Sequence, residues 1–187
     1  MNRVHRWYCR SAFWKNALNK VVIPWALKGL DLGENILEIG SGPGLTTDIL
    51  RRQFNQVTSI EIDSRLARAL KTRLEGTNVR VVEGDATRML FDDNAFSGAV
   101  SFTMLHHIPS PELQDRLLAE VYRVLKQGGI FVGTDSRWSA GLHVFHLFDT
   151  MVVVDPNTFG KRLETAGFTD VKVDLAKRTF RFRAKRL

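Results

Sequence analysis

The chain has almost no cysteine and no long apolar run, and both absences restrict what it can be. Cys9 is its one cysteine, so an internal disulfide framework is impossible, and no Cys/His cluster has the spacing of a zinc site. No uninterrupted apolar segment approaches the roughly 20 residues that span a membrane. The basic N-terminus is not followed by the apolar region of a signal peptide. These features predict a protein of the reducing cytoplasm, without a membrane span and without a metal site.

Acidic residues are missing from both ends of the chain. Residues 1–20 contain five basic residues, residues 176–187 contain six, and neither segment contains an acid. The middle therefore holds 16 of the 27 basic residues together with all 20 acids, although the net charge is +7. The basic ends either bind an anionic partner or are solvated and keep the protein soluble, and we favour the second interpretation.

The pattern along the chain predicts an α/β fold. At 187 residues, with 44% apolar and 25% charged residues, we expect one domain over 1–187. Short apolar runs that suit strands occur at 36–39, 57–62, 79–82, 99–102, 130–134, 171–175 and 179–183. Helical patterns alternate with them, and we expect the helix after Ser110 to end in a glycine cap within 126–129. This alternation predicts a doubly wound, mostly parallel seven-stranded sheet, with the last two strands antiparallel near one edge.

Two segments lie outside this alternation. An N-terminal helical extension over residues 1–30 includes a helix expected at 4–27, with one inner face formed by Trp7, Trp14, Leu18, Val21 and Trp25. An inserted segment over residues 138–154 has a second amphipathic pattern, in Val144, Phe145, Phe148, Met151 and Val152. Each segment could pack on the core or cover a substrate pocket, and we predict that together they form a lid.

A glycine-rich turn follows the first predicted strand. Gly40, Gly42 and Gly44 alternate directly after residues 36–39, and a helix begins near Leu45. Glycines at such a turn let a ligand approach the backbone, and the helix start adds free amide groups. A dinucleotide fingerprint would need its third glycine at position 45, which is Leu45.

Glu38, Gly40, Gly42 and Gly44 form the pattern E-x-G-x-G-x-G. It resembles motif I of the class I S-adenosylmethionine-dependent methyltransferases, of the small-molecule type. Residues 101–108 and 125–129 resemble later segments of the same family, so that the resemblance covers roughly 34–135. Ser97 departs from it, because the family usually has Asp there in a structural role.

The resemblance implies a binding site for S-adenosylmethionine. Glu61, at the end of the second strand, would accept hydrogen bonds from the ribose hydroxyls. Asp85 would bind the adenine amino group, and Glu38 would reach the methionine amino group, often through water. The further cofactor contacts that it implies are Gly40, Ser41, Gly42, Gly44, Ile62, Ala86 and Phe102. An acidic lining also suits a cationic sulfonium better than the pyrophosphate of NAD.

The acceptor class is narrowed by absent motifs. The segment Phe102–Leu105 lacks the N-P-P-Y-like tetrad of nucleic-acid amino methyltransferases, and Cys9 lies outside the motif of a pyrimidine C5 nucleophile. We therefore predict a small, partly aromatic or lipid-like acceptor and metal-independent transfer. Two alternatives stay open: an RNA methyltransferase that uses the basic ends, and a cofactor-binding protein without catalysis.

His106 is the candidate catalytic residue. His106 and His107 follow the fourth strand, where the methyl group is expected, so His106 could orient or deprotonate the acceptor. The alternative is that these histidines pack or cap the loop. The weaker candidates near the same rim are Asp135, His143, His146 and Asp149, with His5 and Tyr8 from the N-terminal segment.

Overall fold

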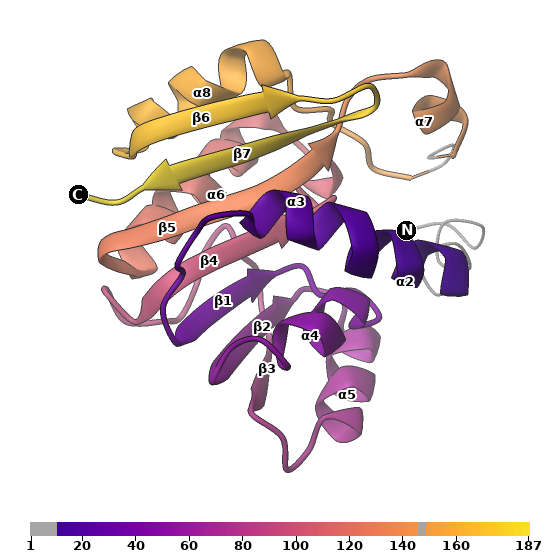
Figure 1. Ribbon diagram of the computed structural model, residues 1–187, viewed down its shortest axis with the longest axis vertical. Helices are drawn as coiled ribbons and strands as arrows, with labels where there is room; N and C mark the ends of the chain where they lie inside the picture. The colour runs from indigo at the N-terminus through magenta and orange to yellow at the C-terminus, as the bar shows by residue number, and fades with distance from the viewer. Residues whose placement is uncertain (1–10, 146–148) are drawn as a thin grey trace.

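The computed structural model describes residues 11–145 and 149–187 and contains a seven-stranded sheet between two layers of helices (Figure 1). The strand order is β3-β2-β1-β4-β5-β7-β6. Strands β1 to β5 pair in parallel, whereas β7 is antiparallel to both β5 and β6. The strands are β1 (Asn35–Ile39), β2 (Gln56–Glu61), β3 (Val79–Glu83), β4 (Phe96–Phe102), β5 (Leu125–Ser136), β6 (Thr169–Leu175) and β7 (Thr179–Lys185). The predicted doubly wound, mostly parallel sheet is confirmed.

Three helices begin at caps that the sequence indicates. Ser110 Oγ accepts the Leu113 amide, and Asp63 and Asp155 accept amides of the first turns of α5 and α8. The helices are α2 (Ala12–Ala17), the π-helix η1 (Leu18–Val22), α3 (Ile23–Leu27), α4 (Leu45–Leu50), α5 (Ser64–Arg73), the 3₁₀ helix η2 (Leu105–His107), α6 (Pro111–Val124), α7 (Ala140–Phe145) and α8 (Pro156–Thr165). In the part of the chain that the structure describes, no helix combines the length and apolar character needed to cross a bilayer.

The core lies on both faces of the sheet. One cluster joins β5 and β7 to α6 and α8, and Phe159 and Leu163 of α8 are fully buried in it. The other joins the sheet to η1, α3 and α4. Phe131 and Val132 are consecutive in β5 and belong to opposite clusters, because side chains alternate along a strand. Burying one such side chain contributes about 1.5–3 kcal/mol, so both helix layers are firmly attached to the sheet.

The N-terminal helix differs from the expectation in its start and in its inner face. Ser11 is extended and caps a helix that begins at Ala12; the expected residues 4–10, including Trp7, lie outside the described residues. The π turn at Leu18–Val22 then rotates the helix surface. As a result Val21 is 63% exposed, and Ile23 takes the inner position instead. Pro24 follows the π turn without ending the helix.

Two further expectations are corrected. Helix α6 ends at Val124, because Leu125 is already extended and pairs with Phe96, so no glycine within 126–129 caps the helix. In the segment 138–154, α7 ends at Phe145, and Met151 and Val152 lie outside any helix. Phe148 and His146 lie outside the described residues.

Ser97 has the structural role that the resemblance assigns to its position. Its Oγ donates to the Asn35 carbonyl at 2.9 Å and accepts the Asn35 amide at 3.1 Å. The hydroxyl therefore joins the starts of β1 and β4, whose opposite ends form the candidate site.

Candidate active site

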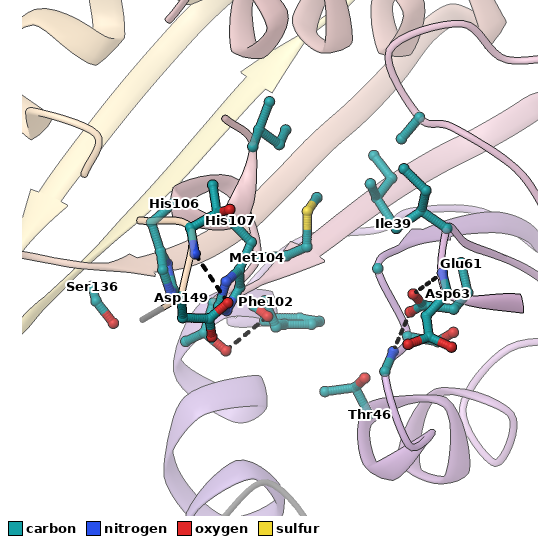
Figure 2. A pocket seen from close by; sticks show the side chains of 18 of the residues that line it. Ile39, Thr46, Glu61, Asp63, Phe102, Met104, His106, His107, Ser136 and Asp149 are labelled. Atoms are coloured by element: carbon teal, nitrogen blue, oxygen red, sulfur yellow. Dashed lines mark hydrogen bonds between the residues drawn. The ribbon is translucent and has the colours of Figure 1, made fainter. Parts of the chain in front are cut away.

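The site lies where the strand order reverses. Strand β1 is flanked by β2 and β4, and the carboxyl ends of these three strands open into one cavity of about 960 Å³. Parallel α/β sheets bind ligands at this kind of switch point. Figure 2 shows Glu61, Asp63 and Thr46 on one side of the cavity and His106, Asp149 and Ser136 on the other, with Phe102 and Met104 between them.

The three glycines of the β1–α4 turn have different roles. All three have positive φ. A Cβ at Gly40 would lie 2.2 Å from Met104 Cγ, and one at Gly44 would lie 2.3 Å from Leu70 Cδ1, so a side chain at either position would have to displace its neighbour. A Cβ at Gly42 would meet nothing within 4 Å. Gly42 therefore presents bare backbone to open space in the cavity, as a close ligand approach needs, whereas Gly44 does not line the cavity.

Glu61 ends β2 and fixes this turn. Its Oε2 accepts the Gly42 amide at 2.7 Å, and its Oε1 accepts the Asp63 amide at 2.9 Å. The side chain is 93% buried yet lines the cavity. Since each carboxylate oxygen can accept two hydrogen bonds, Glu61 can also accept from a ligand hydroxyl.

Glu38 lies beneath the cavity and does not line it. The hydroxyl of Thr46 donates to Oε1, and that of Thr47 donates to Oε2 at 2.6 Å. Burial raises the pKa of this carboxyl, and the threonine hydroxyls and Ser59 offset part of that effect. Thr46 lines the cavity, so Glu38 acts on the site from below, through Thr46.

An apolar edge of the cavity lies beyond Glu61. Ile62 lines the cavity although it is 71% exposed, and Ala86 lines it from the segment after β3. Asp85 precedes Ala86 and accepts the Thr87 amide at 2.8 Å. This combination of an exposed aliphatic side chain and a carboxylate suits a planar ring with an amino group.

His106 and Asp135 form a buried pair at the opposite side. His106 Nδ1 is hydrogen-bonded to Asp135 Oδ1, and the His106 amide donates to Oδ2 at 3.1 Å. Burial opposes the imidazolium, but Asp135, helped by Asp149, outweighs it and raises the pKa of His106. Bonding through Nδ1 directs Nε2 away from Asp135, and His106 and His107 both line the cavity.

The outer cavity wall comes from the two segments outside the βα alternation. Trp14 and Leu18 contribute from the N-terminal helix, and Leu142, Asp149 and Thr150 from the inserted segment. Leu18 is also part of the core, so this helix both packs on the sheet and walls the cavity. Among the weaker candidates His143 does not line the cavity, and His5, Tyr8 and His146 lie outside the described residues.

Most expected site residues therefore meet in one cavity. The expected residues that line it are Gly40, Ser41, Gly42, Glu61, Ile62, Asp85, Ala86, Phe102 and His106. Sequence reasoning missed Thr46, Arg137 and Arg178, which also line it. Thr46 could have been found, because a threonine in the first turn after the glycines lies near any ligand there; the two arginines carried no sequence signal.

The lining agrees chemically with S-adenosylmethionine. Acidic groups surround the turn, as a cation with ribose hydroxyls requires, and the Ser41 hydroxyl is buried without a hydrogen-bond partner in the described part of the chain. A family model described as a methyltransferase domain matches residues 37–133, just over half of the chain. The chain belongs to this family. Its expected membership of the class I S-adenosylmethionine-dependent methyltransferases is thus confirmed, with S-adenosylmethionine as cofactor.

Similar proteins differ in what they methylate. A "Probable ribosomal RNA small subunit methyltransferase A" of Thermococcus sibiricus is 40% identical over 78 residues, which are 42% of this chain and 28% of that protein. A fatty-acid O-methyltransferase of Mycolicibacterium smegmatis is 32% identical over 107 residues, 56% of this chain and 38% of that protein. The chain therefore spans well under half the length of these relatives.

A solved structure supports the whole fold. A SAM-dependent methyltransferase from Aquifex aeolicus is 19% identical, with a TM-score of 0.77 over all of both chains. This similarity supports the methyltransferase fold of the chain.

Proposed function

We propose that this methyltransferase transfers a methyl group from S-adenosylmethionine to a small-molecule acceptor, by direct displacement without a metal. The observation that carries this proposal is the cavity, which extends from the glycine turn past His106 and is walled by Trp14, Leu18 and Leu142. A partly apolar cavity of about 960 Å³ suits a cofactor with a small acceptor beside it. The wall residues from the inserted segment support its role as a lid.

The cofactor is held by the acidic side of the cavity. Glu61 binds the ribose hydroxyls, Ile62 packs on the adenine, and Asp85 accepts from the adenine amino group. Gly42 gives the backbone approach, and Glu38 accepts the hydrogen bond of the Thr46 hydroxyl, which leaves the Thr46 oxygen to accept from the amino group at the methionine end. When bound, S-adenosylmethionine supplies a methyl group on a cationic sulfonium, and the methyl–sulfur bond breaks with its electrons left on a neutral thioether.

The chain contributes alignment and a proton acceptor. The cavity wall positions the acceptor in line with the methyl–sulfur bond, and such alignment can supply about 7–11 kcal/mol of the barrier. An acceptor O–H or N–H must also lose a proton as the new bond forms. Neutral His106 takes this proton at Nε2, because Asp135 holds the Nδ1 proton. Asp135 thus acts as a positioning residue that also stabilises the resulting imidazolium.

The RNA alternative has one observation in its favour, the similarity to a ribosomal RNA methyltransferase. Two residues of the basic C-terminal segment argue against it. Arg181 is paired with Asp174 and lies over the Trp25 ring, and Arg186 donates to the carbonyls of Arg123 and Leu125. These two arginines stabilise the fold, so they are poorly placed to bind phosphates.

A labelled methyl group tests this proposal. The chain is incubated with methyl-labelled S-adenosylmethionine and either the small-molecule fraction or the RNA of a bacterial extract. We expect label in one or more small molecules and none in RNA, and loss of transfer when His106 is replaced by Ala. Label in RNA would favour the alternative, and binding of S-adenosylhomocysteine without transfer to either fraction would favour a non-catalytic protein.

A further inference from the structure

The cavity has opposite charge at its two sides. Glu61, Asp63 and Asp85 line the cofactor side. Arg137 and Arg178 also line the cavity, and in the described part of the chain no other lysine or arginine does so. Both belong to the acceptor side: Arg137 directly follows Ser136, which lies beside His106 and Asp149 in Figure 2.

The two arginines lie opposite each other across a strand pair. The β5–β7 ladder ends with Ser136 opposite Thr179, and the Arg137 amide then donates to the Arg178 carbonyl at 3.0 Å. Side chains at opposed antiparallel positions share one face, and like charges there repel. The fold thus places two arginines at opposed backbone positions, and the side chains of both line the same cavity.

No carboxylate neutralises this pair within the described residues. None of the ion pairs there involves Arg137 or Arg178. Arg137 is half-buried and donates through Nη1 to the Ala176 carbonyl at 2.8 Å, which leaves its other donors available. Arg178 is exposed at the tip of the β6–β7 hairpin. Asp149, which lines this side of the cavity, helps Asp135 to raise the pKa of His106.

Apolar side chains lie in the same cavity. Ile108, Leu113, Leu117 and Leu142 line it together with Trp14. This wall would bury the apolar body of an acceptor, whereas the arginine rim would bind only a charged end. A ligand that meets both requirements is amphiphilic.

We propose that the acceptor carries an anionic oxygen group, a carboxylate or a phosphate, on an apolar body, and that Arg137 and Arg178 bind that group. This inference rests on the proposed function, since it names the class of its small-molecule acceptor. Guanidinium groups match both anions because paired N–H donors can reach two oxygens at once. The arginines select and anchor the acceptor, and His106 acts on it.

Calorimetry on the full chain loaded with S-adenosylhomocysteine tests this. The probes are octanoate, octyl phosphate and octan-1-ol, and the aromatic set benzoate, phenyl phosphate and phenol. We expect at least one anion to bind ten- to a hundredfold more tightly than its neutral counterpart, as charge-assisted hydrogen bonds would give. Preference for the carboxylate or for the phosphate would identify which anion the acceptor carries.

The variant pair Arg137→Gln and Arg178→Gln should remove this preference and leave affinity for the neutral alcohols and for S-adenosylhomocysteine unchanged. Lys177→Gln is the matched control, because Lys177 is Arg178's neighbour on the same hairpin and does not line the cavity. Three outcomes would overturn this inference but leave the proposed function standing. They are equal binding of anions and alcohols, no binding of any anion, and an equal loss of anion preference in Lys177→Gln. Failure of the wild-type chain to bind S-adenosylhomocysteine would instead overturn the proposed function.

Discussion

His106 Nδ1 and Asp135 Oδ1 form a hydrogen bond that joins the segment after β4 to the end of β5. Both side chains are buried, at 2% and 0% exposure. The same carboxylate accepts the His106 amide, so Asp135 fixes both the ring and its backbone. This double contact defines which ring nitrogen can act on an acceptor.

Replacing His106 by Ala should slow methyl transfer by about 10²–10⁴-fold, the usual contribution of a general base. Asp135→Asn should give a smaller loss of the same kind. Affinity for S-adenosylhomocysteine, measured by calorimetry, should stay near that of the wild type in both variants. Full activity of the His106 variant would reduce this residue to packing and leave alignment as the source of catalysis.

The raised pKa of His106 predicts two pH effects. As a base His106 must be neutral, so kcat should rise with pH through a pKa above the usual 6.5, and Asp135→Asn should shift this limb to lower pH. The stability contributed by protonated His106 is present in full below its ordinary pKa. It is lost as the pH rises through the raised value.

Urea unfolding of the wild type and of His106→Gln checks the second effect. The difference in free energy of unfolding between the wild type and His106→Gln should be larger at pH 5.5 than at pH 8.5, because the protonated histidine–aspartate pair is more populated at the lower pH. If this difference in free energy of unfolding did not change with pH, His106 would not be protonated in the folded chain.

Gly42→Val should abolish cofactor binding while the fold survives. The added side chain would occupy open cavity space. Because the backbone at position 42 has a positive φ, a residue other than glycine there would cost about 1–2 kcal/mol of stability. Gly44→Val is the contrasting variant. Its Cβ would collide with Leu70, so this substitution should lower Tm more than Gly42→Val does. Calorimetry that finds unchanged S-adenosylhomocysteine affinity in Gly42→Val would place the cofactor elsewhere.

Glu61→Ala should weaken cofactor binding roughly ten- to a hundredfold, because it removes charge-assisted hydrogen bonds and releases the Gly42 amide. Asp63→Ala should instead cost about 0.5–2 kcal/mol of stability, since Asp63 caps α5. If Asp63→Ala weakened binding and Glu61→Ala did not, the ribose contact would belong to Asp63.

Trp14→Ala should raise KM for the acceptor more than it raises Kd for the cofactor, because Trp14 belongs to the outer wall. Phe13→Ala is its control: Phe13 is 72% exposed and does not line the cavity. Equal effects of Trp14→Ala on KM and on Kd would mean that the helix supports the whole site as core.

Local sequence patterns predicted the fold and the residues on the cofactor side of the cavity, because these patterns are carried by consecutive residues of neighbouring βα units. Glu61 is 19 residues from Gly42, and the glycine turn and the strand end can be read from consecutive residues. The π turn could not be read, since it inserts into a helix whose spacing looks regular, and the expected inner position of Val21 was therefore wrong.

The acceptor side depends on contacts between distant units. Asp135 meets His106 through the β4–β5 pairing, and Arg137 meets Arg178 through the antiparallel return of β7. Antiparallel register is set by the packing of whole strands, so no local sequence motif predicts that two arginines will lie opposite each other. Glu38 shows the converse: its motif is clear in the sequence, but the side chain is buried beneath Thr46 and does not line the cavity.

A crystal structure of the chain with S-adenosylhomocysteine tests the central claim most directly. We predict that the ribose hydroxyls contact Glu61, and that the sulfur lies near Phe102 with the remaining cavity open between it and His106. A sulfur that faces bulk solvent, or a bound cofactor that fills the cavity up to Leu142, would leave no place for a small acceptor and would contradict the account.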